Sequence, residues 1–372
     1  MMIPFGIAMI IAVGNVYSAD GSKQHAQNDG HADDSHGKKE FNAGEMIFHH
    51  IADAHEWHVL DYGDFHLSLP LPVILWHDGG LHVFMSNKFH HGHELYNGFG
   101  IASEGTSSKI VKADLAKFNS EHIIVQDVNF ATPLDFSITK NVLAIFVSAT
   151  ILLWVFISVA NAYRRRGPKA PTGLQSVLEP IILFVRDNIA RPSIGEKKYA
   201  HFMPFLLTIF FFIFLNNLMG LVPFFPGGAN VTGNIAVTLV LALFTFFAII
   251  FTANKNYWMH IFNTPGVPWM LKLPIPLMPV IELSGLFIKP AVLMIRLFAN
   301  ITAGHIISLA FVSLIFIFGN KGDIFGYMIS PVSVIFSIFV KFIELLVAFI
   351  QAYVFTLLSA LYFGMAVEEA HH

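Results

Sequence analysis

The sequence predicts an all-α polytopic membrane protein with about five transmembrane helices, the last two forming a long tilted hairpin, and a small N-terminal extramembrane domain with some β-structure. Of the 372 residues, 55% are hydrophobic and only 13% are charged, which is far more apolar than a soluble domain. The apolar residues gather in long segments after about Asn141, whereas the preceding part is polar and rich in histidine. The net charge of -3 provides no basic surface that would indicate nucleic-acid binding.

The N-terminal part divides into a signal peptide and an outer domain. Residues 1–19 have an apolar core of about ten residues, too short to span a bilayer, followed by small residues. We interpret them as a signal peptide, with a plain hydrophobic N-terminus as the alternative. Residues 20–136 hold fourteen of the nineteen histidines and form the expected His-rich periplasmic domain. Within it, two apolar runs flank His77-Asp78-Gly79-Gly80 and predict a β-hairpin.

The remaining residues, 137–372, form the predicted transmembrane domain, which begins with three ordinary spans. Residues 141–163 contain no Asp, Glu, Lys, Arg or His and predict one span. The basic run RRRGPK follows, which places that end in the cytoplasm by the positive-inside rule and leaves the N-terminal domain outside. Residues 173–198 predict a helix lying in the membrane interface. Residues 202–254 predict two further spans joined outside, and the aromatic and proline-rich stretch 254–276 predicts a loop at the cytoplasmic face. The C-terminus is expected in the cytoplasm.

The last two apolar segments, about 280–318 and 328–367, are twice as long as an ordinary span. Each would form a helix of ~60 Å, against a hydrocarbon thickness of ~30 Å. The second has neither glycine nor proline from 332 to 363, so a tilted helix is expected rather than a fold-back. These segments also contain six ionisable side chains, which usually mark ion pathways or proton relays in membranes. The six are Glu282, Lys289, Arg296, His305, Lys341 and Glu344.

Arg296 is the most demanding of the six, because an arginine at the bilayer centre costs at least ~2.5–3.5 kcal/mol. Its guanidinium stays charged at any physiological pH, whereas Glu282 and His305 can exchange protons. These two groups lie ~21 Å before and ~13 Å after Arg296 along a helix axis. The order predicts a fixed cation between two titratable stations, which blocks direct proton leak and attracts a mobile carboxylate.

Further polar residues share faces with these groups. Asn300 follows Arg296 by one helical turn, and Glu344 and Gln351, seven residues apart, lie on one face of the last segment. Lys341 and Glu344 are neighbours at i, i+3, so a merely local ion pair is the alternative for them.

Four stretches of the apolar segments carry a recognisable pattern. PAVLMIRLFANITAGHII holds an arginine, then Leu-Phe, a small residue, Asn and Ala-Gly, and it is joined by ELLVAFIQAYVFTLL, FIFLNNLMGLVPFF and NVTGNIAVTLVLAL. Together they resemble subunit a of F-type ATP synthases, over roughly residues 130–367. The N-terminal domain goes beyond that family's compact pattern.

The resemblance implies a proton-translocating stator subunit, non-catalytic by itself, that offers two offset half-channels to a rotating c-ring in the bacterial inner membrane. The b subunits of a peripheral stalk and the lipid bilayer are further implied partners. Arg296 matches the essential arginine facing the ring carboxylate, and Glu282 matches an acid on the cytoplasmic access path. The polar set around the outer half-channel is matched by Asn300, His305, Glu344 and Gln351. Some members exchange the histidine and the acid between these two helices, which supports contact between His305 and Glu344.

Two other functions stay open from the residues alone. A divalent-metal transporter with a His-rich collector predicts paired histidines or acids on the spans, where only His305 lies well inside one. A membrane anchor for an outer binding domain leaves the charged hairpin unexplained. The sequence contains no Walker-type glycine loop, so we expect neither nucleotide nor another cofactor. For the outer domain, clustered histidines favour either transition-metal binding or a cap that buffers protons.

Overall fold

The computed structural model describes residues 42–62, 65–92, 94–102, 109–115, 118, 124–127, 130–166, 170–222, 226–262 and 277–368. The predicted signal peptide lies outside these residues. The chain divides into two compact units. The first comprises Met1–Ile145, Met219–Val231 and Thr302–Glu344, and the second comprises Phe146–Leu218, Thr232–Ile301 and Leu345–His372.

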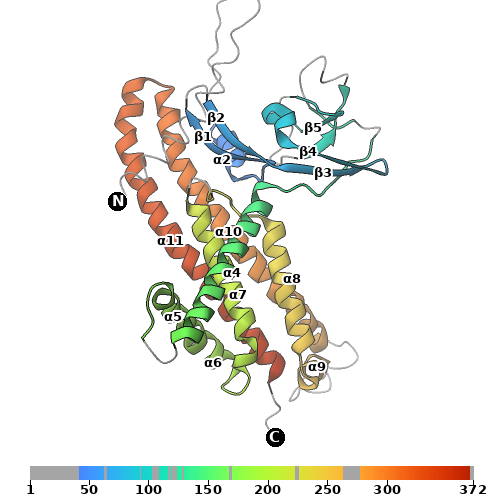
Figure 1. Cartoon of the computed structure of the whole chain (residues 1–372), viewed down its shortest axis with the longest axis vertical. Helices are drawn as coiled ribbons and strands as arrows, with labels where there is room; N and C mark the ends of the chain where they lie inside the picture. The colour runs from blue at the N-terminus through green and yellow to red at the C-terminus, as the bar shows by residue number, and fades with distance from the viewer. Residues whose placement is uncertain are drawn as a thin grey trace, which may run out of the picture. The chain divides into compact units, whose positions relative to one another are not determined.

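The first unit contains a small β-rich part (Figure 1). Its elements are α2 (Ala43–Ile51), β1 (Glu56–Tyr62), β2 (Phe65–Pro70), β3 (Pro72–His77), β4 (Gly80–Met85), the 3-10 helix η1 (Ser86–Gly92), β5 (Phe99–Ile101), β6 (Ile110–Lys112) and β7 (Leu134–Asp135). The strands form two antiparallel pairs, β1–β2 and β5–β6, and a three-stranded sheet in the order β4-β3-β7.

The predicted hairpin is confirmed as β3–β4. Asp78 and Gly79 connect the strands with φ of 48° and 75°, the left-handed conformation that a two-residue type I′ turn needs at both positions. The inward side chains of β3, Val73 and Leu75, are fully buried against Phe89, and this contact forms the centre of the β-rich core.

The β-rich part is hydrogen-bonded to the beginning of the first long helix, α4 (Lys140–Arg166). The Asp53 carboxylate accepts hydrogen bonds from the Thr139 hydroxyl at 2.8 Å and from the Asn141 amide at 3.1 Å. The Lys140 amide donates to the Ala54 carbonyl at 2.8 Å. An acid from far away in the sequence thus satisfies a free amide at the positive end of the helix dipole.

Five described helices are long and apolar enough to cross a membrane, as the sequence predicted. They are α4, α7 (Tyr199–Leu221), α8 (Ile235–Thr252), α10 (Leu277–Gly319) and α11 (Asp323–Val367). The last two have 43 and 45 residues and run without a break through Pro290 and Pro331. In the first unit they form the predicted hairpin, where the Phe311 and Phe336 rings stack at 5.3 Å.

The predicted interfacial helix begins as α5 (Leu174–Phe184), continues as the π-helical turn η2 (Val185–Ala190) and ends as α6 (Arg191–Ile194). The prediction of a loop for 254–276 was wrong at its start, where α9 (Lys255–Phe262) forms. This stretch precedes the first proline of the segment, and Ile261 is buried, so a short helix can form and pack. Residues 263–276 lie outside the described part.

The C-terminal end of α11 is fixed by close backbone contacts within the second unit. A Cβ placed on Gly364 would overlap the Ser193 carbonyl oxygen, so α6 and α11 touch backbone to backbone. The Val367 carbonyl accepts hydrogen bonds from Asn254 Nδ2 at 3.0 Å and Lys198 Nζ at 2.9 Å. These donors satisfy a carbonyl that the helix itself leaves free.

Candidate functional site

Arg296 lies on an exposed stripe of α10. Residues at every fourth position are exposed along this stripe, namely Ser284, Ile288, Val292, Arg296 and Asn300. A parallel row of exposed residues lies beside it and is formed by Phe287, Ala291, Ile295 and Ala299. The other residues of the stripe are uncharged, so the guanidinium is an exposed charge on a largely apolar surface. Sequence spacing alone correctly predicted that Asn300 shares this face.

Two tyrosines of the second unit lie near the other ionisable residues of α10. The Lys289 ammonium lies 5.4 Å from the ring centre of Tyr362, a cation–π contact with α11. Tyr257, on α9, is partly buried, and burial together with the negative charge of Glu282 raises the pKa of its hydroxyl. Glu282 therefore lies close enough to α9 to influence the Tyr257 hydroxyl, fourteen residues before Arg296 on α10.

Glu344 is buried in the first unit, and its exposed fraction is only 7%. Its Oε2 lies 2.7 Å from Lys341 Nζ, so the local ion pair considered from the sequence is present. Its Oε1 has no hydrogen-bond partner among the described residues. A Cβ placed on Gly304 would lie 3.2 Å from Glu344 Cγ, which shows that the carboxylate passes close to the backbone of α10. A buried carboxylate oxygen that lacks a hydrogen bond from the protein is an expected position for an ordered water or a proton donor.

His305 follows Gly304 on α10 and is partly buried. A Cβ placed on Gly220, near the end of α7, would lie 3.6 Å from His305 Nε2, so the imidazole packs over this glycine. The structure thus brings His305 and Glu344 to neighbouring backbone positions of one unit, His305 beside Gly220 and Glu344 beside Gly304. Gln351, which the sequence grouped with Glu344, is buried on α11 in the second unit.

Sequence reasoning missed a group of buried polar residues on α7 and the loop after it. Asn217 is buried, donates to the Ala348 carbonyl of α11 at 3.2 Å and accepts from the Thr232 hydroxyl. In the first unit, Asn230 is buried with neither amide atom hydrogen-bonded to a described residue. The pair Asn216-Asn217 inside an otherwise apolar span was the signal that could have found this group, because buried amides need partners or water.

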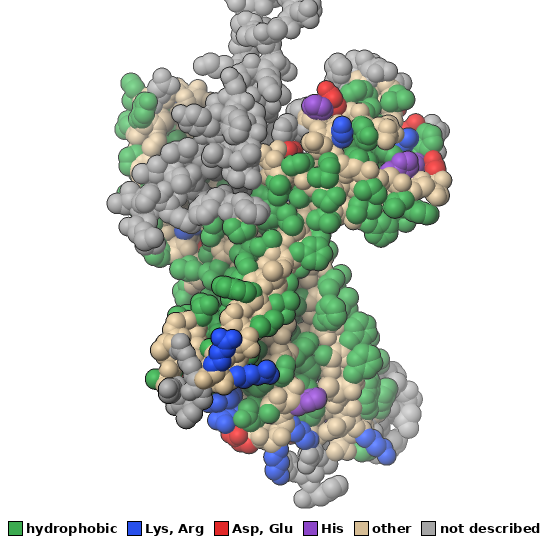
Figure 2. Space-filling model, in the orientation of Figure 1, with side chains coloured by type: hydrophobic (Ala, Val, Ile, Leu, Met, Phe, Trp, Pro, Cys, Tyr) green, Lys and Arg blue, Asp and Glu red, His purple; other side chains and the backbone are tan. Residues whose placement is uncertain are grey.

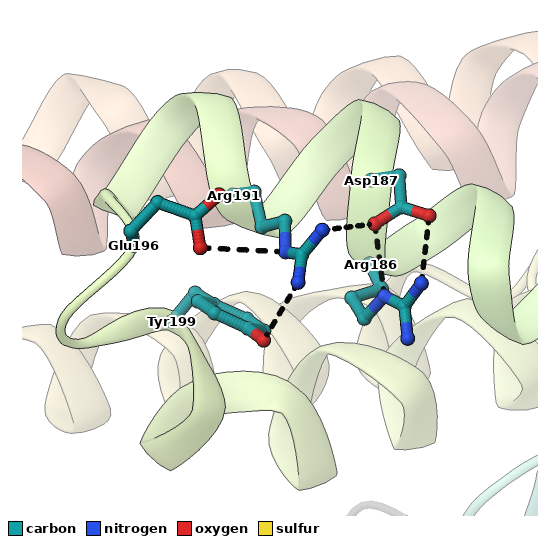
Figure 3. A network of polar contacts seen from close by, with 5 residues as sticks. All are labelled: Arg186, Asp187, Arg191, Glu196 and Tyr199. Atoms are coloured by element: carbon teal, nitrogen blue, oxygen red, sulfur yellow. Dashed lines mark hydrogen bonds and ion pairs between the residues drawn. The ribbon is translucent and has the colours of Figure 1, made fainter.

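A second polar group joins the segment α5–η2–α6 to the start of α7 (Figure 3). Arg186 makes a bidentate contact with Asp187 at 2.8 and 2.9 Å, and Arg191 also donates to Asp187 at 3.0 Å. Arg191 further donates to the Tyr199 hydroxyl at 3.3 Å and lies 3.6 Å from Glu196. The hydrogen bonds from Arg186 keep the pKa of the Asp187 carboxyl below its usual value. This network is exposed, so its contribution to stability is small.

Among the described residues, no three histidine or acidic side chains lie close enough to share a metal ion. His90 and Glu94 approach to 3.5 Å but are both largely exposed. The buried His55 pairs with Asp135 at 3.0 Å. The side chains of five other histidines of the outer region lie outside the described part, namely His49, His50, His58, His91 and His93.

Comparison with known proteins assigns most of the chain to a family. Residues 142–364 match the family described as ATP synthase A chain, and residues 46–136 match one described only as a domain of unknown function. The ATP synthase subunit a of Chlorobium phaeobacteroides (strain BS1) is 34% identical over 100% of this chain and 92% of the relative. The ATP synthase subunit a 2 of Chlorobium luteolum is 36% identical over 94% of this chain and 83% of the relative. The ATP synthase subunit a of Myxococcus xanthus is 41% identical over 64% of this chain and 76% of the relative.

Proposed function

Because the chain belongs to the ATP synthase A chain family, we propose that Arg296 is the residue on which its proton transport depends. The chain is a proton-translocating stator subunit of the membrane sector and is not itself catalytic. It is a multi-pass protein of the inner membrane and works there with the c-ring and the b subunits. What remains to be assigned is the part that each of its own residues takes.

The exposed position of Arg296 carries the proposal. A guanidinium surrounded by apolar side chains attracts an ionised carboxylate on the ring far more strongly than water-exposed charges attract each other. It cannot give up its proton, so it separates the two access paths electrostatically. A ring carboxylate that has accepted a proton is neutral and can pass into lipid, where its charged form would be too costly.

We assign the two offset half-channels to groups on either side of Arg296. On the outer side, His305 and Glu344 receive protons, and Asn300 and Gln351 extend the polar lining toward the ring. On the inner side, Glu282 accepts the proton when the ring carboxylate ionises. This assignment is supported by the partial burial of His305, by the burial of Glu344 and by Glu344 Oε1, which has no hydrogen-bond partner among the described residues. Each proton that crosses supplies ~2.3 kcal/mol per 100 mV of membrane potential.

We infer the orientation in the membrane from the positive charges. Arg164 and Arg165 end α4, and Arg186 and Arg191 lie on the interfacial segment. Figure 2 shows lysine and arginine side chains gathered at this end of the helices. By the positive-inside rule this end belongs in the cytoplasm, which supports a periplasmic outer domain and a cytoplasmic C-terminus.

The alternative of a divalent-metal transporter finds no support. The family match extends over residues 142–364, which include most of the five apolar helices, and the described residues contain no metal-binding group of three side chains.

The proposal is tested by Arg296→Lys, measured as proton-driven ATP synthesis in membrane vesicles. We expect synthesis to be lost although a cationic side chain remains, because lysine lacks the planar fork of arginine and loses its proton more readily when desolvated. Arg164→Lys, at the exposed end of α4, is the matched control and should leave the rate unchanged. Near-normal synthesis by Arg296→Lys in a fully assembled complex would show that the assignment is wrong.

A further inference from the structure

The three-stranded sheet of the outer part is apolar on both of its faces. One face carries Val73 and Leu75 into the domain core. On the other face, six apolar side chains are exposed to between 42% and 64%, and they are Trp76, Leu81, Val83, Met85, Leu134 and Phe136. Antiparallel sheets at a protein surface normally alternate apolar and polar residues, so that one face is compatible with water. An apolar patch of this extent on an extramembrane domain indicates a surface that is covered in the native protein.

The strand pairing shows that these side chains form one continuous face. Trp76 is paired with both Leu81 and Leu134 in the sheet, so the three lie side by side across all three strands. Along β4, Leu81, Val83 and Met85 alternate with less exposed residues, as expected for one side of a strand. Figure 2 shows hydrophobic side chains gathered over this part of the surface. None of the six carries a charge, and only the indole of Trp76 offers a hydrogen bond.

The sheet that carries this apolar face is hydrogen-bonded to the residues that lead into the first membrane span. The Phe136 amide donates to the Ile74 carbonyl at 2.9 Å, and the Ile138 amide donates to the Pro72 carbonyl at 3.1 Å. The pairing therefore continues to two residues before Lys140, where α4 begins. Even fully extended, the four residues from Phe136 to Lys140 span at most ~14 Å. The face is held within that reach of the point where the chain enters the bilayer.

We propose that the apolar sheet face rests on the outer leaflet of the lipid bilayer, so that the outer domain is a membrane-seated domain rather than one surrounded by water. The short, hydrogen-bonded connection to α4 leaves the domain little freedom to move away from the membrane. Tryptophan and phenylalanine are suited to the membrane–water boundary, where Trp76 can bury its ring and keep its N–H near headgroups. A protein partner would be expected to find polar groups for specific hydrogen bonds on such a face, and the six side chains offer almost none.

The chain contains no cysteine, so single cysteines can be introduced and labelled without background. Val83→Cys and, independently, Leu81→Cys would carry an environment-sensitive nitrobenzoxadiazole label on the apolar sheet face. Asn87→Cys, exposed and outside this face, is the matched control. The full-length chain would be reconstituted in vesicles of phosphatidylethanolamine and phosphatidylglycerol, with and without lipids that bear a nitroxide near the headgroup. Both Val83 and Leu81 are already exposed, so neither change removes core packing.

We expect labels at positions 83 and 81 to be quenched by the nitroxide lipids, and quenching by iodide, present on both sides of the vesicles, to be several-fold weaker than at position 87. Equal iodide quenching at all three positions would mean that the face is in water, and the proposal would be wrong. Protection from iodide without quenching by the nitroxide lipids would also overturn it, because the face would then be covered by protein.

Discussion

His305 and Glu344 are the two residues whose chemistry depends most directly on each other in the proposed outer path. Each alanine substitution is expected to slow proton uptake, and the double variant should be little slower than the worse single variant, because both groups serve one proton transfer. The measurement is passive proton flux through the membrane sector in vesicles, analysed as a double-mutant cycle.

The control for this cycle pairs Glu344→Ala with His201→Ala, which removes an exposed histidine at the start of α7. That pair should be additive. If the His305 and Glu344 losses are also fully additive, the two groups act independently and do not form one path.

We expect the Asp135 carboxyl to contribute to the pH dependence of the outer domain's stability. Burial alone would raise the pKa of its carboxyl, but hydrogen bonds from His55 and Ser137 lower it below the usual 3.8. A group with a lowered folded pKa stabilises the fold fully above its unfolded pKa, and this contribution is lost as the pH falls through the folded pKa.

We therefore expect Asp135→Asn to reduce the stability of the full chain near neutral pH and to flatten its decline toward about pH 3. Denaturant unfolding followed by tryptophan fluorescence at several pH values would measure this. Glu94→Gln serves as control, because the pair of Glu94 with His90 is exposed on both sides and contributes little. An unchanged acid profile in Asp135→Asn would show that the pair with His55 does not contribute.

At the level of elements, the sequence predicted what depends on local pattern. The β3–β4 turn, the five spans and the unbroken length of α10 and α11 all follow from turn residues or apolar runs. It did not predict the π-helical turn of η2, because Val185–Ala190 contains neither glycine nor proline to mark a departure from α-helical geometry. Nor did it predict that Gly304 lies against Glu344, since such contacts arise only when helices distant in sequence pack together. The roles proposed for the site residues remain predictions.

The packing of α11 against α6 at Gly364 leaves no room for one added carbon atom. A methyl group there would overlap the Ser193 carbonyl oxygen, and because this oxygen belongs to the backbone, α11 would have to move away from α6. We expect Gly364→Ala to destabilise the full chain by roughly 1–3 kcal/mol, as for other overpacked sites. Its effect can be read from thermal unfolding in detergent.

Gly285 offers the matched control, because a Cβ there would meet nothing within 4 Å. Gly285→Ala should be neutral or stabilise α10 by about 0.5–1 kcal/mol, the ordinary helix preference of alanine. Equal effects of the two substitutions would contradict the close packing of α6 and α11.

For the whole molecule, Asp53 joins the two regions that match different families. It lies in the 46–136 region and caps α4, where the 142–364 region begins. Asp53→Ala should lower stability by about 0.5–2 kcal/mol, the usual effect of losing a helix cap, and Asp53→Asn should lose less because one acceptor oxygen remains. Glu94→Ala, which removes an exposed acid, should change little. Thermal unfolding of the full chain would rank the three, and a ranking with Glu94→Ala as the most damaging would refute the cap.

The exposed stripe of α10 has a mechanical consequence. A surface past which another subunit turns is a bearing, and its friction depends on how unevenly it attracts what slides over it. On the stripe, Ser284 already donates its hydroxyl to the Val280 carbonyl, and in the row beside it Ala291 and Ala299 present only methyl groups. A carboxylate moving along this track would meet shallow, nearly uniform contacts until it reached Arg296. If Arg296 takes the role proposed for it, this face would act as a smooth bearing that holds the ring at one angle through its charge and releases it when the ring carboxylate is neutralised.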